Sequence, residues 1–81
     1  MNVVVLTPGN EIYNGPATSV KVPGVGGEFE ILSNHAPIVS SLAAGKVRII
    51  GEGEGRKEFT IQKGFVEVLN NEVSVLVEGL E

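Results

Sequence analysis

The 81-residue sequence contains no cysteine, no aspartate and no tryptophan, and histidine occurs only once. Without cysteine there is neither a disulfide nor a cysteine-based metal site. A Ser-His-acid triad drawn from Ser40 or Ser41, His35 and a glutamate has no support in the spacing. The short supply of nucleophiles, bases and metal ligands therefore argues against an enzyme, and it implies no metal and no cofactor.

Long apolar runs are absent as well. No run approaches the ~20 residues that span a bilayer, and the opening MNVVVLTPG lacks the basic region of a signal peptide. The six basic residues are scattered and the net charge is -4, so nucleic acid is not an expected partner. We therefore expect no signal peptide and no transmembrane segment, and contact with a membrane only through a protein partner.

No helical period is sustained over a dozen residues, and short alternating runs take its place. The turn signals include Pro-Gly at 8–9, the glycine-rich residues 51–55 and Asn-Asn at 70–71, while 63–64 is expected to form a tight turn or bulge. Many short strands between such turns predict one all-β domain over residues 1–81, a sandwich or a barrel. The strands are expected at residues 2–7, 11–14, 18–22, 28–32, 37–42, 46–50, 56–62, 65–69 and 72–77.

The most informative stretch is residues 22–37, VPGVGGEFEILSNHAP. Its glycine-rich start lacks the Lys-Ser/Thr of a phosphate loop, so a nucleotide site is not expected there. The strand that follows directs Phe29 and Ile31 inward and Glu28 and Glu30 outward. A solvated strand face explains the two carboxylates better than a catalytic pair, and a charged docking face competes with that explanation.

His35 is the sharpest single feature of the stretch. Its simplest interpretation is a loop histidine whose ring bonds a nearby carbonyl, because a lone histidine cannot build a metal site. The residues before it, Ser33 and Asn34, are expected to form a turn.

Several motifs occur in an order that resembles a known family. A first strand ends in TP, VPGVGGEFEIL is followed by HAP, and LAAGKVRI and GFVEVLNNEVSVLVE come after them. Together these motifs cover essentially the whole chain and resemble the N-terminal domain of the epsilon subunit of bacterial F-type ATP synthases. The resemblance implies a flattened ten-stranded β-sandwich of two mostly antiparallel sheets.

The same resemblance implies a function. It points to a non-catalytic central-stalk, or rotor, subunit of a proton-translocating ATP synthase that couples the gamma subunit to the ring of c subunits. It implies no cofactor and a peripheral location at the cytoplasmic face of the bacterial inner membrane. Whether the coupling ion is H⁺ or Na⁺ is left open.

The resemblance also assigns contact residues. The acid of the family's GE motif corresponds to Glu28 and the histidine before Ala-Pro to His35, both near the polar loops of the c ring. Those loops usually carry an arginine, which a carboxylate complements. The chain departs from the family at Glu30, often a glycine, and at Ser33-Asn34, often Pro-Gly. Glu30 either strengthens the contact or is merely solvated. The contact candidates are thus Glu28, Glu30, Ser33, Asn34 and His35.

Two alternatives stay open. The family's C-terminal pair of helices is missing from the 81 residues, through a naturally short chain or a truncation, and residues 77–81 lack linker character, which favours a natural end. ATP binding and inhibition of hydrolysis are not ascribed to the chain.

A free-standing β-sandwich that binds a small ligand or carbohydrate is the alternative function. It needs an aromatic-lined concave face, whereas three of the four aromatic residues are expected to face the core; a small β enzyme ranks last.

Overall fold

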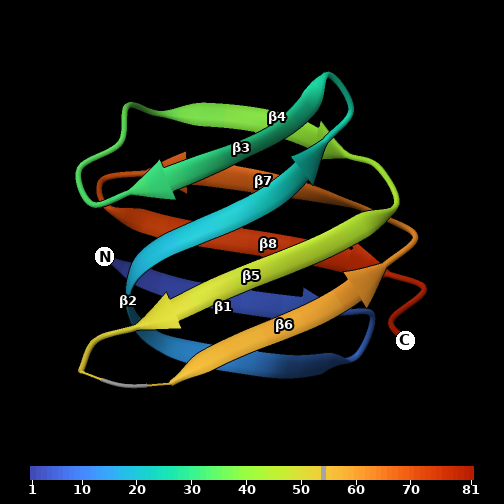
Figure 1. Ribbon diagram of the computed structural model, residues 1–81, viewed down its shortest axis with the longest axis horizontal. Coiled ribbons are helices and arrows are strands. Elements are labelled where there is room, and N and C mark those ends of the chain that lie inside the picture. Colours follow the sequence, from blue (N-terminus) through green and yellow to red (C-terminus); the bar gives the residue numbers. More distant parts are fainter. Residues whose placement is uncertain (54) are drawn as a thin grey trace.

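The chain folds into eight β-strands in two layers, as the computed structural model shows for residues 1–53 and 55–81 (Figure 1). No helix occurs among these residues, so none of them forms a helix able to cross a membrane. The all-β prediction is confirmed, but the count of ten strands is wrong. The strands are β1 (Asn2–Thr7), β2 (Asn10–Gly24), β3 (Gly27–Leu32), β4 (Ile38–Leu42), β5 (Gly45–Gly51), β6 (Arg56–Ile61), β7 (Lys63–Leu69) and β8 (Glu72–Glu78).

β2 accounts for part of the lower strand count. Residues 11–14 and 18–22, predicted as two strands, belong to one strand of 15 residues. Its first half pairs with β1 and its second half with β3 and β5. The register against β5 shifts between Ala17 and Ser19, so the strand bends there instead of ending. Gly15 and Pro16, which lie between the two predicted strands, are where the pairing with β1 ends.

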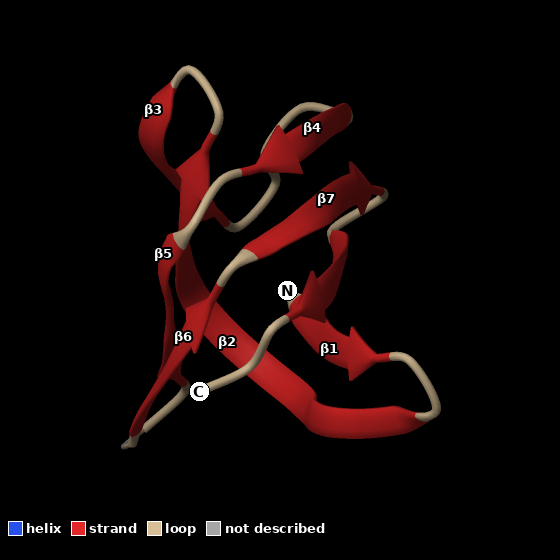
Figure 2. Cartoon of the chain, turned by 90° about the vertical axis from the view of Figure 1, so that its right-hand side faces the viewer, coloured by secondary structure: helices blue, strands red, loops and turns tan. Residues whose placement is uncertain are grey.

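β2 is also the element that joins the two layers. One layer consists of the first half of β2 followed by β1, β8, β7 and β4; the other consists of β3, the second half of β2, β5 and β6. Figure 2 shows the two layers from the side, with β2 running from one to the other. Among the strands of the described residues, β1 and β8 are the one parallel pair, so the sheets are mostly antiparallel as predicted.

The core between the layers is built mainly of valine. Alternation along each strand directs every second side chain inward, and ten of the fifteen buried hydrophobic residues are valines. Tyr13, Phe29 and Phe59 pack against this core from its margin, so three aromatic residues turn inward as predicted. Phe65 is 42% exposed and faces outward. The fully buried branched side chains explain why these segments prefer strands.

Most turns follow the sequence signals. Pro8 and Gly9 link β1 to β2, with Gly9 at φ 85°, and Asn70 and Asn71 link β7 to β8 at φ 51° and 64°. Two consecutive positive φ values define the type I′ hairpin that matches the twist of the strands. The predicted tip at residues 51–55 includes residue 54, which lies outside the described residues.

The prediction for residues 63–64 is wrong. Lys63 and Gly64 form no turn, because they are the first residues of β7, which the chain reaches from β6 through a bend at Gln62. β6 and β7 belong to different layers, so this junction is a crossing between layers. A Cβ on Gly64 would lie 2.5 Å from the carbonyl oxygen of Leu76. Glycine is needed here for a close approach of two strands.

Candidate functional site

The structure does not assemble the triad considered from the sequence. The Ser40 hydroxyl donates to the carbonyl of Ser41 at 3.4 Å, and Nδ1 of His35 lies 2.7 Å from the carbonyl oxygen of Ala36. Within residues 1–53 and 55–81 there is no group of three residues that could hold a metal ion. The candidate functional site is therefore a set of surfaces.

Glu28 and Glu30 project from the outer side of β3 and are both exposed, as alternation predicts. The pairing with β2 places Glu28 opposite Pro23 and Glu30 opposite Lys21. The hydroxyl of Ser19, a residue only 8% exposed, donates to Oε2 of Glu30 at 2.5 Å. No described residue forms a hydrogen bond or ion pair with the carboxylate of Glu28. Glu28 is therefore open to a partner, whereas Glu30 is tied into its own sheet.

The surroundings of Glu30 form what we call the charged face, the outer side of the layer that contains β3, β5 and β6. Pairing across four strands lines up Glu30, Lys21, Arg48 and Glu58 in one row. Nε of Arg48 lies 2.8 Å from Oε2 of Glu58. The contact is an ion pair rather than a hydrogen bond, because Nε–H has no hydrogen-bond acceptor among the described residues. Each carboxylate of the row thus lies next to a cation, whereas the two cations, Lys21 and Arg48, lie opposite each other.

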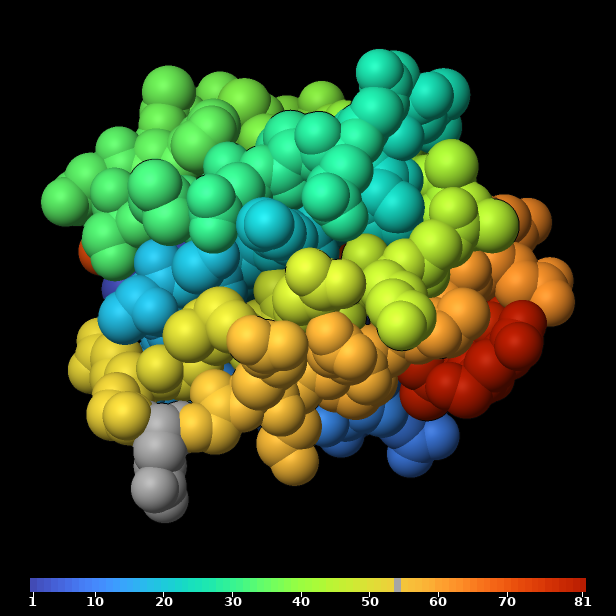
Figure 3. Space-filling view, viewed as in Figure 1, coloured from blue at the N-terminus to red at the C-terminus, as the bar shows by residue number. Residues whose placement is uncertain are grey.

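The charged face has only a shallow hollow. A depression of about 220 Å³ is lined by the side chains around Glu30, namely Ser19, Lys21, Glu30, Arg48, Ile50 and Arg56. The space-filling view shows the same face, with β3 and β5 in green and yellow-green above the orange β6 (Figure 3). This volume lies below the ~300–1,000 Å³ typical of ligand pockets.

His35 lies in loop 33–37, which links β3 to β4. The backbone N–H of His35 donates to the carbonyl of Leu32 at 3.1 Å and closes a turn in which Asn34 has φ 66°. The predicted turn at residues 33–34 and the predicted bond from the His35 ring to a nearby carbonyl are both confirmed. A carbonyl oxygen only accepts hydrogen bonds, so this contact requires a proton on Nδ1.

The five predicted contact residues spread along one edge and do not converge on a point. Glu28 is near the start of β3, and His35 follows its end. At about 3.3 Å per strand residue, Glu28 and Leu32 alone are ~13 Å apart. Figures 1 and 3 show this edge in green at the top of the molecule, formed by β3, loop 33–37 and β4. Ser33, Asn34 and His35 share its loop, while Glu28 and Glu30 lie on its strand.

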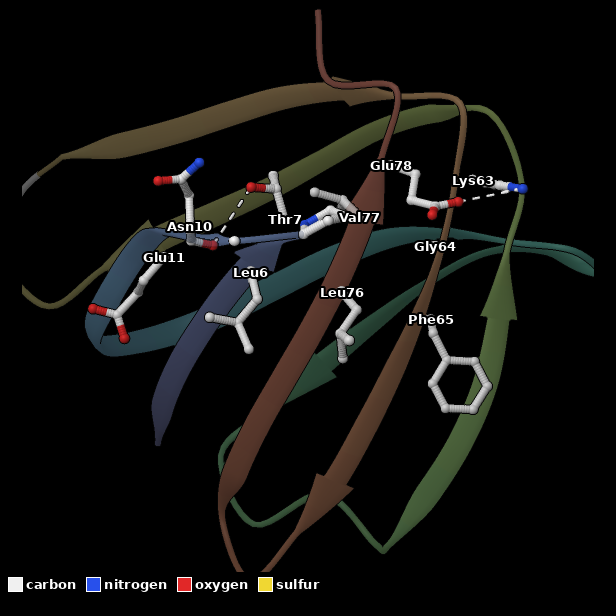
Figure 4. A pocket seen from close by; sticks show the side chains of 12 residues that line it. Leu6, Thr7, Asn10, Glu11, Lys63, Gly64, Phe65, Leu76, Val77 and Glu78 are labelled. Carbon is white, nitrogen blue, oxygen red and sulfur yellow. Dashed lines mark hydrogen bonds and ion pairs between the residues drawn. The ribbon is translucent and has the colours of Figure 1, made fainter.

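A second surface was missed by the sequence reasoning. Leu6, Phe65 and Leu76 point outward from three adjacent strands of the other layer, and we call their surroundings the apolar face. The register places Leu76 opposite both Leu6 of β1 and Phe65 of β7. Figure 4 shows the three side chains directed to the same side of the sheet, in a groove of about 630 Å³. Leu76 is 48% exposed and Phe65 42%.

Polar groups are confined to the ends of this groove. Nζ of Lys63 lies 3.3 Å from Oε2 of Glu78, and the Thr7 hydroxyl donates to the carbonyl of Asn10 at 3.5 Å (Figure 4). Phe65 is the only aromatic residue in the lining. The groove therefore lacks the aromatic-lined surface that a carbohydrate-binding module would need.

The sequence did carry a signal for the apolar face. A strand with one face in water alternates between apolar and polar residues, whereas a strand covered on both faces reads as a continuous apolar run. Residues 3–6 read VVVL and 75–77 read VLV. These runs break the alternation at the outward positions Val4, Leu6 and Leu76.

The family model for "ATP synthase, Delta/Epsilon chain, beta-sandwich domain" matches residues 1–81. An ATP synthase epsilon chain from Leptospira borgpetersenii serovar Hardjo-bovis is 42% identical over 96% of this chain and 61% of that protein. The epsilon chain of Chlorobium limicola is 38% identical over 94% of this chain and 86% of that protein.

Solved structures give the same fold. A chain in the structure of the Euglena gracilis mitochondrial ATP synthase, OSCP/F1/c-ring, matches 98% of this chain with a TM-score of 0.89 and 21% identity, over 51% of its own length. A chain in the central stalk/c-ring of the Tetrahymena thermophila mitochondrial enzyme matches with a TM-score of 0.83 at 20% identity. The chain spans about three fifths of the length of the Leptospira protein.

Proposed function

The chain belongs to the family of the β-sandwich domain of ATP synthase delta/epsilon chains, and we propose that it works as a non-catalytic part of the central stalk of an F-type, proton-translocating ATP synthase. In this role it couples the gamma subunit to the ring of c subunits. It contributes no catalytic residue and binds no cofactor. Its location is peripheral, at the cytoplasmic face of the bacterial inner membrane, and its contact with the membrane is indirect, through the c ring.

The observation that carries this proposal is the presence of two exposed surfaces with different chemistry. The apolar face offers a groove of about 630 Å³ around Leu6, Phe65 and Leu76, while the edge of β3 and loop 33–37 carries mostly polar side chains, with the exposed Leu32 among them. Exposed apolar grooves of this kind mark protein contacts. A subunit that links two partners needs two such surfaces, and similar chains occur in the structures of an ATP synthase OSCP/F1/c-ring and of a central stalk/c-ring.

We assign the polar edge to the c ring. Glu28 is exposed, and its carboxylate has no partner within the described part of the chain. A carboxylate on the rim of an interface attracts a cation such as arginine and steers the approach of the partner. Glu30 contributes less, because its carboxylate already accepts a hydrogen bond from Ser19. Ser33, Asn34 and His35 complete the polar edge beyond the end of β3.

We assign the apolar face to the gamma subunit. Burial of Leu6, Phe65 and Leu76 would remove apolar surface from water, at about 25 cal/mol per Å². The polar groups at the ends of the groove, such as Lys63 and Glu78, would form the rim of this contact.

The test is a binding experiment with both partners. The purified chain is offered to the cognate gamma subunit and, separately, to the detergent-solubilised c ring. We expect micromolar or tighter binding to gamma, and Glu28→Lys should weaken binding to the c ring while binding to gamma stays unchanged. Glu52→Lys, an exposed glutamate in the turn after β5, is the matched control.

Two results would contradict the proposal. Failure of the chain to bind gamma at micromolar concentration would overturn the stalk role. Normal rotor assembly and normal proton-coupled ATP synthesis with Glu28→Lys would overturn the assignment of Glu28.

A further inference from the structure

Loop 33–37 carries His35 but has few bonds of its own. The N–H of His35 donates to Leu32, and the His35 ring donates to Ala36. Both bonds join residues at most three positions apart, so they shape the loop locally without fixing it to the sheets. Residues 33 to 36 are exposed or half-buried, and they offer the loop little packing.

One bond connects the loop to a distant part of the chain. Oδ1 of Asn71 accepts the backbone N–H of Asn34 at 2.8 Å, although the two residues are 37 positions apart. A backbone N–H can only donate, so the side-chain amide of Asn71 must present its oxygen to the loop. Of the hydrogen bonds found in residues 1–53 and 55–81, this is the one that ties loop 33–37 to a residue beyond its flanking strands.

Asn71 is itself firmly held. Its backbone carbonyl accepts the N–H of Asn2 at 3.2 Å, so it is joined to the start of β1. It also occupies the two-residue turn between β7 and β8, whose strands pair directly up to Leu69 and Glu72. The bond to Asn34 therefore ties the loop, which crosses from β3 in one layer to β4 in the other, to the turn of the β7–β8 hairpin.

We propose that Asn71 is a positioning residue, whose side chain holds loop 33–37, and with it His35, in the orientation in which the polar edge meets its partner. The docking part rests on the proposed contact with the c ring. The brace, by which we mean the hydrogen bond from the Asn34 N–H to Oδ1 of Asn71, is a property of the isolated chain. Holding the loop before contact lowers the entropy lost on binding, and this raises affinity without any contact from Asn71 itself.

A simpler explanation is that asparagine occupies position 71 only because the turn requires φ 64° there. The two explanations separate by substitution. Asn71→Gly keeps the backbone conformation, since glycine adopts positive φ at no steric cost, but it removes the acceptor. Asn71→Asp keeps an acceptor and also tolerates positive φ. Asn70→Gly changes the neighbouring exposed turn residue, at φ 51°, and leaves the brace intact.

The experiment compares the full chain with these three variants. Amide hydrogen exchange, followed by NMR, reports on the loop through the Asn34 amide. We expect Asn71→Gly to speed that exchange by about tenfold, whereas Asn71→Asp and Asn70→Gly leave it within about twofold. Binding to the detergent-solubilised c ring should weaken about threefold to tenfold in Asn71→Gly, as expected for one lost hydrogen bond. Asn71→Asp should restore it, and binding to gamma should be unchanged in all variants.

Each outcome is decisive. Unchanged exchange at Asn34 in Asn71→Gly would overturn the brace, and faster exchange with unchanged c-ring affinity would overturn its role in docking. Loss of affinity that Asn71→Asp does not restore would also count against it. If the unmodified chain fails to bind the c ring at all, the proposed function fails together with the docking role, while the exchange rates still confirm or overturn the brace.

Discussion

The outer faces of the two layers differ in how far their side chains interact with other side chains of the same face. On the charged face, Glu30 is bonded to Ser19 and Arg48 is paired with Glu58. On the apolar face, Leu6, Phe65 and Leu76 lie side by side across three strands and line an open groove. The charged face thus carries side chains that are bonded or paired within the chain, whereas the apolar side chains of the other face are exposed.

This difference indicates which face gains from association. Covering the apolar face removes hydrocarbon from water and disturbs few polar bonds. Covering the charged face would strip water from ions whose mutual attraction already compensates for part of their burial, which often yields no net gain. We therefore expect substitutions on the apolar face to alter partner binding and those on the charged face to alter mainly the stability of the chain.

The largest expected effect comes from a charge in the middle of the apolar face. Leu76→Glu should weaken binding to gamma at least ~30-fold, because it places a carboxylate in the centre of the proposed contact. The variant should still fold, since Leu76 is 48% exposed. Isothermal titration calorimetry measures the affinity and circular dichroism the fold.

The control for this substitution lies on the other face. Lys46→Glu changes an exposed residue of β5 and should alter gamma binding by less than about threefold, as expected outside a contact. The reverse pattern, with Lys46→Glu disruptive and Leu76→Glu silent, would show that gamma binds the charged face.

A smaller effect is expected at the floor of the groove. Gly64→Ala should lower the free energy of unfolding by about 1–3 kcal/mol, because the new methyl group would be forced against the β8 backbone. Its Cβ would lie 2.5 Å from the carbonyl oxygen of Leu76. Urea unfolding measures the change. Gly26→Ala, where the added atom meets nothing within 4 Å, should stay within ~0.5 kcal/mol of the original chain. Equal stability of the two variants would contradict the close packing of β7 on β8.

The hydrogen bond below the charged face should contribute next. Ser19→Ala removes the donor to Glu30 and should cost about 1–2 kcal/mol of unfolding free energy, since the acceptor is charged but exposed. Ser74→Ala on β8 removes a hydroxyl that forms no hydrogen bond with any described residue and should cost less than ~0.5 kcal/mol. Thermal unfolding of both variants gives the comparison. A loss in Ser74→Ala as large as that in Ser19→Ala would remove the distinction between the faces.

The smallest effects concern the two ion pairs. Lys63 and Glu78 are 72% and 53% exposed, and Lys63→Met should change stability by less than ~0.5 kcal/mol. Arg48→Met should cost somewhat more, up to ~1 kcal/mol, because Arg48 and Glu58 are only 35% and 37% exposed. Because salt screens ion pairs, the stability lost in each variant should be smaller at high salt than at low salt. A larger and more salt-sensitive loss of stability in Lys63→Met than in Arg48→Met would contradict this order of the two ion pairs.

Local signals predicted most of the fold. The turns at residues 8–9 and 70–71 and the alternation of Glu28 with Phe29 are properties of a few neighbouring residues, and all were anticipated. β2 was split because Gly15 and Pro16 are local signs of a turn. Its continuity depends on pairing with β1 on one side and with β3 and β5 on the other, and no short stretch of sequence contains that information.

The same limit applied to the candidate site. The outward direction of Glu28 follows from alternation, but the bond from Ser19 to Glu30 depends on how β2 is aligned with β3. The apolar face needs Leu6, Phe65 and Leu76 on adjacent strands, although they are scattered through the chain. The bond from Asn34 to Asn71 spans 37 positions. The sequence alone identified many of the residues involved, but it could not predict which distant residues would be in contact.

The parallel pairing of β1 with β8 has a consequence for how the chain is made. Asn2 pairs with Glu72, its neighbour across the sheet, 70 positions later (72 − 2). At the ~5–20 residues per second of protein synthesis, the first strand waits about 4–14 s for this partner to be synthesised. During that interval β1 lacks one of the two strands with which it pairs in the folded chain. The nascent chain is thus most exposed to aggregation before β8 emerges.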